Sequence, residues 1–136
     1  MTIKFYDRDH RAFFEQHNTG DVYQRAFFYT IGLCPATRSH AAELYNIGKR
    51  EILPEAMSAE WQTGTSAKVT RLAFNLFTDG TPTAYRFDEN NRDLPVNDDD
   101  RREAALFSVS DIFCCEYAAY FFEAIKLRYP EYFCNP

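Results

Sequence analysis

The sequence lacks the short motifs that usually carry phosphate binding or hydrolytic catalysis. It has no glycine-rich phosphate loop, no Gly-x-Ser-x-Gly turn and no Glu-x-x-His pair, and it contains only five glycines. Phosphate loops need close backbone approach, and di-metal helical bundles need paired ligands on one helix face. We therefore expect a protein that is not an enzyme and that holds no cofactor.

Histidine and cysteine are scarce, and their spacing does not suit a metal. The chain has three histidines and four cysteines, but no Cys-x-x-Cys or His-x-x-x-His pair. Adjacent residues such as Cys114 and Cys115 point about 100° apart on a helix. Free cysteine behaves as a small buried hydrophobe. We expect no bound metal, and we expect these thiols to lie in the core.

The N-terminus lacks the apolar segment of a secretory signal peptide. Residues 1–10 read MTIKFYDRDH, in which charged and polar residues outnumber apolar ones. Cysteines in a chain without such a signal are expected to stay reduced. The sequence thus predicts a cytoplasmic protein.

The C-terminal region holds the longest apolar stretch. Between residues 112 and 129 only Glu116, Glu123, Lys126 and Arg128 interrupt the apolar and aromatic side chains. These charges argue against a membrane span. Glu116, Glu123 and Lys126 would share one narrow stripe of a helix. We predict one continuous helix over residues 110–129, buried on most sides, with that stripe facing solvent, and no membrane partner.

Amphipathic periodicity elsewhere indicates further helices and little β-structure. Asp21 and Gln24 form a capping box before a helix that ends at Gly32. The clearest helical period predicts a helix from Ser66 to about Phe77. Shorter helices are expected near 9–18, 37–47, 54–61 and 98–107, with at most a small β-ribbon near 78–87. The sequence predicts a mainly α-helical protein, an irregular single-domain bundle of about six helices around a buried C-terminal helix, over 1–136.

Negative charge is concentrated in one segment of the chain. The net charge is −5, which disfavours general binding to nucleic acid or anionic membrane. Within residues 88–103 three arginines accompany seven acidic side chains. These are Asp88, Glu89, Asp93, Asp98, Asp99, Asp100 and Glu103. The segment is a candidate surface for a basic partner, which it could engage by imitating a phosphate backbone.

A second candidate surface lies on the helix expected from Ser66. Lys68, Arg71 and Asn75 occupy the side opposite its apolar face, and such residues contact phosphates or bases in DNA readers. A short helix from Pro54 and a turn at Gly64 precede it, which is the order of a helix-turn-helix. Many bundles also contain two helices joined by a glycine turn. DNA binding is therefore our second hypothesis.

Several strings of residues are similar to those of a known family. They are Asp21-Val-Tyr23, Thr37-Arg38, Trp61–Ser66 with Lys68–Leu76, and Asp111–Cys115 with Glu123–Tyr132. The chain resembles a family of short proteins of unknown function, found mainly in conjugative and phage-like mobile elements of Gram-positive gut bacteria. The resemblance spans most of the chain, except residues 88–103, and implies no functional residue.

The resemblance implies a cellular context rather than a mechanism. Small non-catalytic proteins of mobile elements often inhibit host defence, as anti-CRISPR proteins do. Combined with the size, the charge pattern and the missing catalytic motifs, this context leads to our main hypothesis. We expect a protein-binding module that inhibits a host or element protein by occlusion. The alternative is a helix-turn-helix transcriptional regulator.

Overall fold

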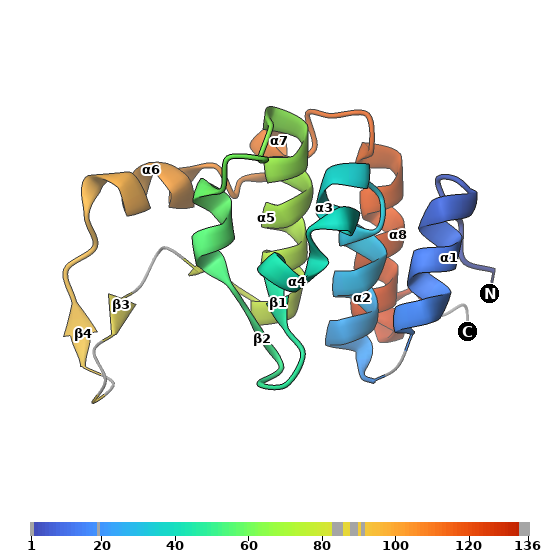
Figure 1. Ribbon diagram of the computed structural model, residues 1–136, viewed down its shortest axis with the longest axis horizontal. Helices are drawn as coiled ribbons and strands as arrows, with labels where there is room; N and C mark the ends of the chain where they lie inside the picture. Colours follow the sequence, from blue (N-terminus) through green and yellow to red (C-terminus); the bar gives the residue numbers. More distant parts are fainter. Residues whose placement is uncertain (1, 19, 83–85, 88–89, 91, 134–136) are drawn as a thin grey trace.

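The computed structural model describes residues 2–18, 20–82, 86–87, 90 and 92–133. Within these residues the chain is mainly α-helical with two short antiparallel ribbons, which confirms the predicted fold class (Figure 1). The elements are α1 Arg8–His17, α2 Val22–Ile31, α3 Pro35–Ser39, α4 Ala41–Leu44, β1 Tyr45–Asn46, β2 Glu51–Ile52, the 3-10 helix η1 Pro54–Ser58, α5 Gly64–Thr78, β3 Arg86–Phe87, β4 Asp93–Leu94, α6 Asp98–Ala105, α7 Val109–Ile112, α8 Ala118–Arg128 and the 3-10 helix η3 Pro130–Tyr132.

Helix α2 lies at the centre of the bundle and packs against α5, α8 and α1 (Figure 1). Its predicted capping box is present: the Asp21 carboxylate accepts the Gln24 N–H (3.0 Å), and the Gln24 side chain accepts the Asp21 N–H (3.3 Å). Every residue from Ala26 to Ile31 is buried. A helix that is buried on all sides must be surrounded by other elements, so α2 organises the bundle.

The buried side chains form two clusters, and α2 contributes to both. Tyr29 belongs to the cluster that includes Phe121 of α8, whereas Phe27 and Phe28 belong to the cluster that includes Phe74 of α5. The ring of Phe27 lies 5.3 Å from that of Phe28 and 6.4 Å from that of Phe74. Such aromatic pairs add about 0.5–1.5 kcal/mol beyond the area that they bury. The high aromatic content therefore serves mainly the core.

The prediction of one continuous helix over 110–129 is wrong. The run forms α7 and α8, which are separated by the connection 113–117. On a continuous helix, Ile112 and Phe121 would point in opposite directions, since nine residues at about 100° each place them about 180° apart. In the structure both side chains enter the same core cluster, together with Tyr117. The break in the helix makes this shared burial possible.

The charged and thiol side chains of this run also differ in part from the prediction. Glu123 is buried rather than solvent-facing: it accepts the Lys4 N–H (3.3 Å), and its carboxylate lies 3.9 Å from Lys126 Nζ. Cys114 is exposed and Cys115 is half-buried, so the expectation that both are core thiols is also wrong. Of the predicted solvent stripe, Glu116 is exposed and Lys126 is half-exposed, but Glu123 is covered by the N-terminal segment at Lys4.

Three local boundaries differ from the predictions. The helix expected over 37–47 is replaced by α3, α4 and strand β1, whose Tyr45 pairs with Ile52 of β2. Helix α5 begins at Gly64, where a turn was expected, because Thr63 and Ser66 form a capping box. The second ribbon pairs β3 with β4; of the strand expected near 78–87, residues 83–85 lie outside the described part of the chain.

Arg128 joins the C-terminal ends of α8 and α5. Its guanidinium donates to the Leu76 carbonyl (3.0 Å) and to both carboxylate oxygens of Asp79 (2.7 Å each). It also lies 3.7 Å from the centre of the Tyr23 ring of α2. Asp79 has the left-handed conformation (φ 57°) that ends α5. One buried cation therefore links three helices.

Replacing Arg128 by methionine should lower the free energy of unfolding by about 1.5–3 kcal/mol, because the Leu76 carbonyl and the Asp79 carboxylate would lose the charged hydrogen bonds that they accept from the guanidinium. Urea unfolding measures this loss. Arg101→Met on α6 is the control, and it should cost less than about 1 kcal/mol because both side chains of its ion pair with Asp98 are exposed. Equal losses in the two variants would contradict the role of Arg128.

His10 connects the N-terminal segment to α2 through a buried imidazole. Its Nδ1 accepts the Tyr6 N–H (3.0 Å), so Nε2 carries the proton and donates to the Tyr29 carbonyl (2.7 Å). Burial lowers the pKa of His10 from its ordinary 6.5 to about 4, and Arg38 acts in the same direction; the Tyr29 carbonyl and Asp7 oppose the shift. The imidazole is therefore neutral near neutral pH.

Because the unfolded chain binds this proton more tightly, stability should fall as the pH drops from about 6.5 to about 4. Between about pH 7 and pH 5 this effect of His10 should lower the free energy of unfolding by about 2 kcal/mol. Urea unfolding of the wild type and of His10→Gln at the two pH values isolates the effect of His10. The variant should be less stable than the wild type at pH 7, and its stability should depend less on pH. The same pH dependence in both proteins would contradict this assignment.

Candidate interaction surface

Helix α6 carries Asp98, Asp99, Asp100 and Glu103 of the acidic segment 88–103. None of its eight residues, all of them described, is buried. Asn97 caps the helix by accepting the Asp100 N–H (2.7 Å), and Asp98, Asp99 and Asp100 occupy the first turn, where the helix dipole favours negative charge. Figure 1 shows α6 and the β3–β4 ribbon at the end of the molecule opposite α1. We call α6 with this ribbon the arm.

The arm is tied to the bundle near the end of α6. The Arg71 guanidinium of α5 donates to both carboxylate oxygens of Glu103 (2.6 and 2.9 Å). The two side chains are only 12% and 19% exposed. Four residues further on, Phe107 packs against both core clusters. A two-pronged ion pair of this kind orients its partners as well as attracting them, so this contact sets the direction in which the arm leaves the bundle.

The acidic residues predicted as a partner surface are not equivalent in the structure. Asp93, Asp98 and Asp99 are exposed, whereas Asp100 is half-buried and Glu103 pairs with Arg71. Arg101 lies 2.9 Å from Asp98, and Arg102 pairs with Asp99. Such exposed pairs contribute little to stability. Asp88 and Glu89 lie outside the described part of the chain.

The second predicted surface is engaged within the chain. Lys68, Arg71 and Asn75 each use their polar groups to hold another segment against α5. Their partners are, in the same order, the carbonyl of Cys114 (2.7 Å), the carboxylate of Glu103 and the carbonyl of Gly80 (2.9 Å). The three residues thus position the connection 113–117, the arm and the chain that follows α5.

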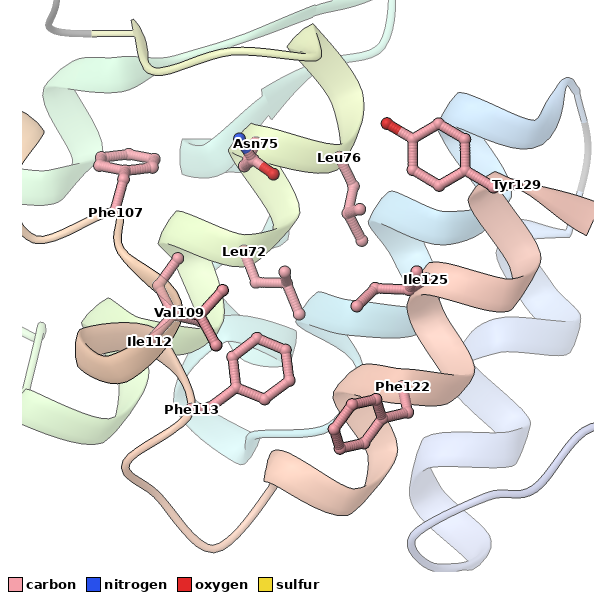
Figure 2. Close-up of a pocket in the computed structure, with 10 residues that line it drawn as sticks. All are labelled: Leu72, Asn75, Leu76, Phe107, Val109, Ile112, Phe113, Phe122, Ile125 and Tyr129. Atoms are coloured by element: carbon pink, nitrogen blue, oxygen red, sulfur yellow. The ribbon is translucent and has the colours of Figure 1, made fainter. Parts of the chain in front are cut away.

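An apolar groove, which sequence reasoning missed, lies between α5, α7 and α8 (Figure 2). Its volume is about 300 Å³. The lining residues are Leu72, Asn75 and Leu76 of α5, Phe107 before α7, Val109 and Ile112 of α7, Phe113, and Phe122, Ile125 and Tyr129 at α8. The groove exists because the C-terminal run breaks at 113–117, which places α7 opposite α8.

Two of the lining side chains make the groove open to solvent. Val109 on one wall is 72% exposed and Phe122 on the other is 58% exposed. The rings of Phe113 and Phe122 lie 5.3 Å apart and close one end, and Leu72 and Leu76 form the floor in Figure 2. The groove is thus an open, apolar concavity that apolar side chains of another molecule could fill.

The histidine and cysteine side chains of the described residues lie apart from the arm and from the groove lining. Among the described residues, no three histidine, cysteine or acidic side chains gather where they could hold a metal ion. Burial raises the pKa of the Cys115 thiol, which disfavours the reactive thiolate. His40 stacks on Trp61 (4.2 Å between ring centres), whose indole N–H donates to Glu43 (2.7 Å). These contacts serve packing and helix connection.

Comparison with known proteins places the chain in a family. It belongs to a family of unknown function, DUF6075, whose model matches residues 1–135. Neither the curated proteins nor the solved structures include a significant match to the chain. Within the described residues, no helix is both long enough and apolar enough to span a membrane. The protein is therefore a helical bundle that belongs to a family of unknown function.

Removing the Arg71–Glu103 ion pair should loosen the arm before it affects the bundle. In Arg71→Ala, hydrogen exchange of the α6 amides should accelerate by about tenfold or more, because a mostly buried carboxylate loses a contact of about 1.5–3 kcal/mol. The amides of α2 should respond much less. Arg101→Ala, which removes an exposed pair, is the control. Similar exchange of α6 in both variants would show that another contact holds the arm.

Proposed function

We propose that this chain is a non-catalytic protein-binding module whose contact surface is the arm together with the adjoining groove. The observation that carries the proposal is the state of α6. A helix that is polar on all sides gains little from packing on its own bundle, yet α6 is capped and held in place by a mostly buried ion pair. Such a helix is suited to meeting another molecule.

The distribution of charge supports a basic partner. Residues 93–116, which run from the arm through α7 to the connection, contain seven acidic and two basic side chains. Their net charge equals that of the whole chain, so the rest of the protein is neutral on balance. A surface with one sign of charge steers association with a partner of the opposite sign and suppresses wrong partners.

The resemblance to proteins of mobile elements of gut bacteria supports a more specific role. We propose that the partner is a host defence protein in the cytoplasm and that the chain inhibits it by occlusion, as anti-CRISPR proteins do. Defence effectors that act on nucleic acid carry basic channels for its phosphates. The carboxylates of Asp98 and Asp99 lie on a projecting helix, and in such a channel they would exchange their exposed pairs with Arg101 and Arg102 for the cations of the partner.

Regulation by DNA binding has weaker support. The Lys68 amine, the Arg71 guanidinium and the Asn75 amide, which would contact phosphates or bases, are engaged with other parts of the chain. The element before α5 is the five-residue 3-10 helix η1, and the segment 59–63 separates it from α5. A helix-turn-helix instead uses two α-helices joined by a three- to four-residue turn.

Affinity capture from lysate of a bacterium with characterised defence systems tests the proposal. The wild-type chain should recover a nuclease effector or another defence complex. Asp98→Asn with Asp99→Asn should reduce recovery by about tenfold, since it removes two exposed charges from the contact surface. Asp9→Asn with Glu15→Gln makes the same change of charge on exposed residues of α1, at the opposite end of the molecule, and should leave recovery unchanged.

Two outcomes would contradict the proposal. Recovery of duplex DNA with no defence protein would favour the regulator. Equal recovery of a defence protein by the wild type and both double variants would show that the arm is not its contact surface.

A further inference from the structure

We infer that the groove between α5, α7 and α8 is the docking site for an amphipathic helix of the partner, one that carries basic residues beside its apolar face. The inference rests on the proposed protein-binding function and names the chemistry of the partner. It depends on the shape of the groove, on the exposure of its walls and on the charge beside them.

The groove has the dimensions of a helix-docking site. On the α8 side, Phe122, Ile125 and Tyr129 stand at i, i+3 and i+7 in one row, about 10 Å long. Leu72 and Leu76 line the floor from α5, and α7 forms the opposite wall (Figure 2). Two turns of an incoming helix place their own i, i+3 or i+4, and i+7 side chains along the same length.

The volume favours anchoring side chains over an enclosed ligand. About 300 Å³ lies at the low end of the range for small-molecule pockets, which run from about 300 to 1,000 Å³ and cover most of the ligand surface. Here both walls reach solvent through Val109 and Phe122. A partner that inserts a few apolar side chains and rests its backbone on the rim buries both exposed residues.

The charge beside the groove selects a basic helix. Asp111 of α7 is half-buried and Glu116 in the connection is exposed, and the arm adds further carboxylates beyond Phe107. The nearby cations already have partners within the chain: Lys68 donates to the Cys114 carbonyl and Arg71 to Glu103. Arg101 and Arg102 of the arm pair with Asp98 and Asp99. On α8, Lys126 faces Glu123 in a separate pocket that also includes Ile3 and Phe133.

This charge also argues against a second copy of the chain as the occupant. Two copies joined groove to groove would bring together two surfaces that carry the same sign of charge. Like charges across an interface are unfavourable. A basic partner helix instead meets the acidic side chains with opposite charge.

A synthetic helix tests the inference directly. The probe is a fluorescein-labelled peptide of about 15 residues, a length at which isolated helices begin to form. It has leucine at i, i+3, i+4 and i+7, lysine at a few positions beside this apolar face, and alanine elsewhere to favour the helix. Two control peptides have the same composition in scrambled order, or glutamate in place of every lysine. Fluorescence anisotropy measures binding to the full chain.

The wild-type chain should bind the lysine peptide, and binding should weaken with added salt. Phe122→Ser and Val109→Ser should each weaken it by about tenfold or more, because an apolar anchor contact is lost. Ile47→Ser is the matched control: Ile47 is 70% exposed on the β1–β2 turn, away from the groove. All three side chains are largely exposed, and melting temperatures verify that each variant folds.

Three results would overturn the inference: no binding of the lysine peptide by the folded chain, equal binding of a control peptide, or a wild-type dimer that Phe122→Ser dissociates in sedimentation. The test is separate from that of the proposed function. Loss of peptide binding with intact capture of a defence protein refutes the groove alone. Peptide binding without any captured defence protein refutes the proposed inhibitor and leaves the groove standing.

Discussion

The burial on all sides of the C-terminal part of α2, Ala26–Ile31, is the constraint on which the rest of the structure depends. Consecutive residues of this helix enter two different core clusters, so α1, α5 and α8 must surround it at once. Two polar side chains then attach other segments to α2. His10 of α1 donates to the Tyr29 carbonyl, and Arg128 of α8 lies over the Tyr23 ring. Because the surrounding helices fill the core, α6 and one side of both α7 and α8 remain exposed and can contact another molecule.

The sequence predicted the features that depend on local contacts. The capping box of Asp21 and Gln24 and the apolar period of α5 involve neighbours within a few residues, and both appear as expected. The break at 113–117 was not predictable from periodicity, because it results from Ile112 and Phe121 reaching the same cluster. The ties of Arg128 to Asp79 and of Arg71 to Glu103 join residues 49 and 32 positions apart.

The same holds for the candidate surface: its composition could be predicted from the sequence, but its arrangement in space could not. The acidic composition of 88–103 was evident from the sequence, but the arm is oriented by an arginine on α5. The groove was hidden, because its walls come from three helices and its existence depends on the unexpected break. The sequence did contain the row of Phe122, Ile125 and Tyr129 at i, i+3 and i+7. In a helix that is apolar on nearly all sides, however, such a row is expected to face the core rather than a groove.

The central claim is that one surface, formed by the arm and the groove, meets the partner while α2 and its neighbours provide the support. Hydrogen exchange of the chain with and without its captured partner tests this most directly. We predict new protection in α6, α7 and the exposed face of α8, with little change in α1 and in the already protected α2. Protection confined to α1 or to the β1–β2 ribbon, with α6 to α8 unchanged, would contradict the account.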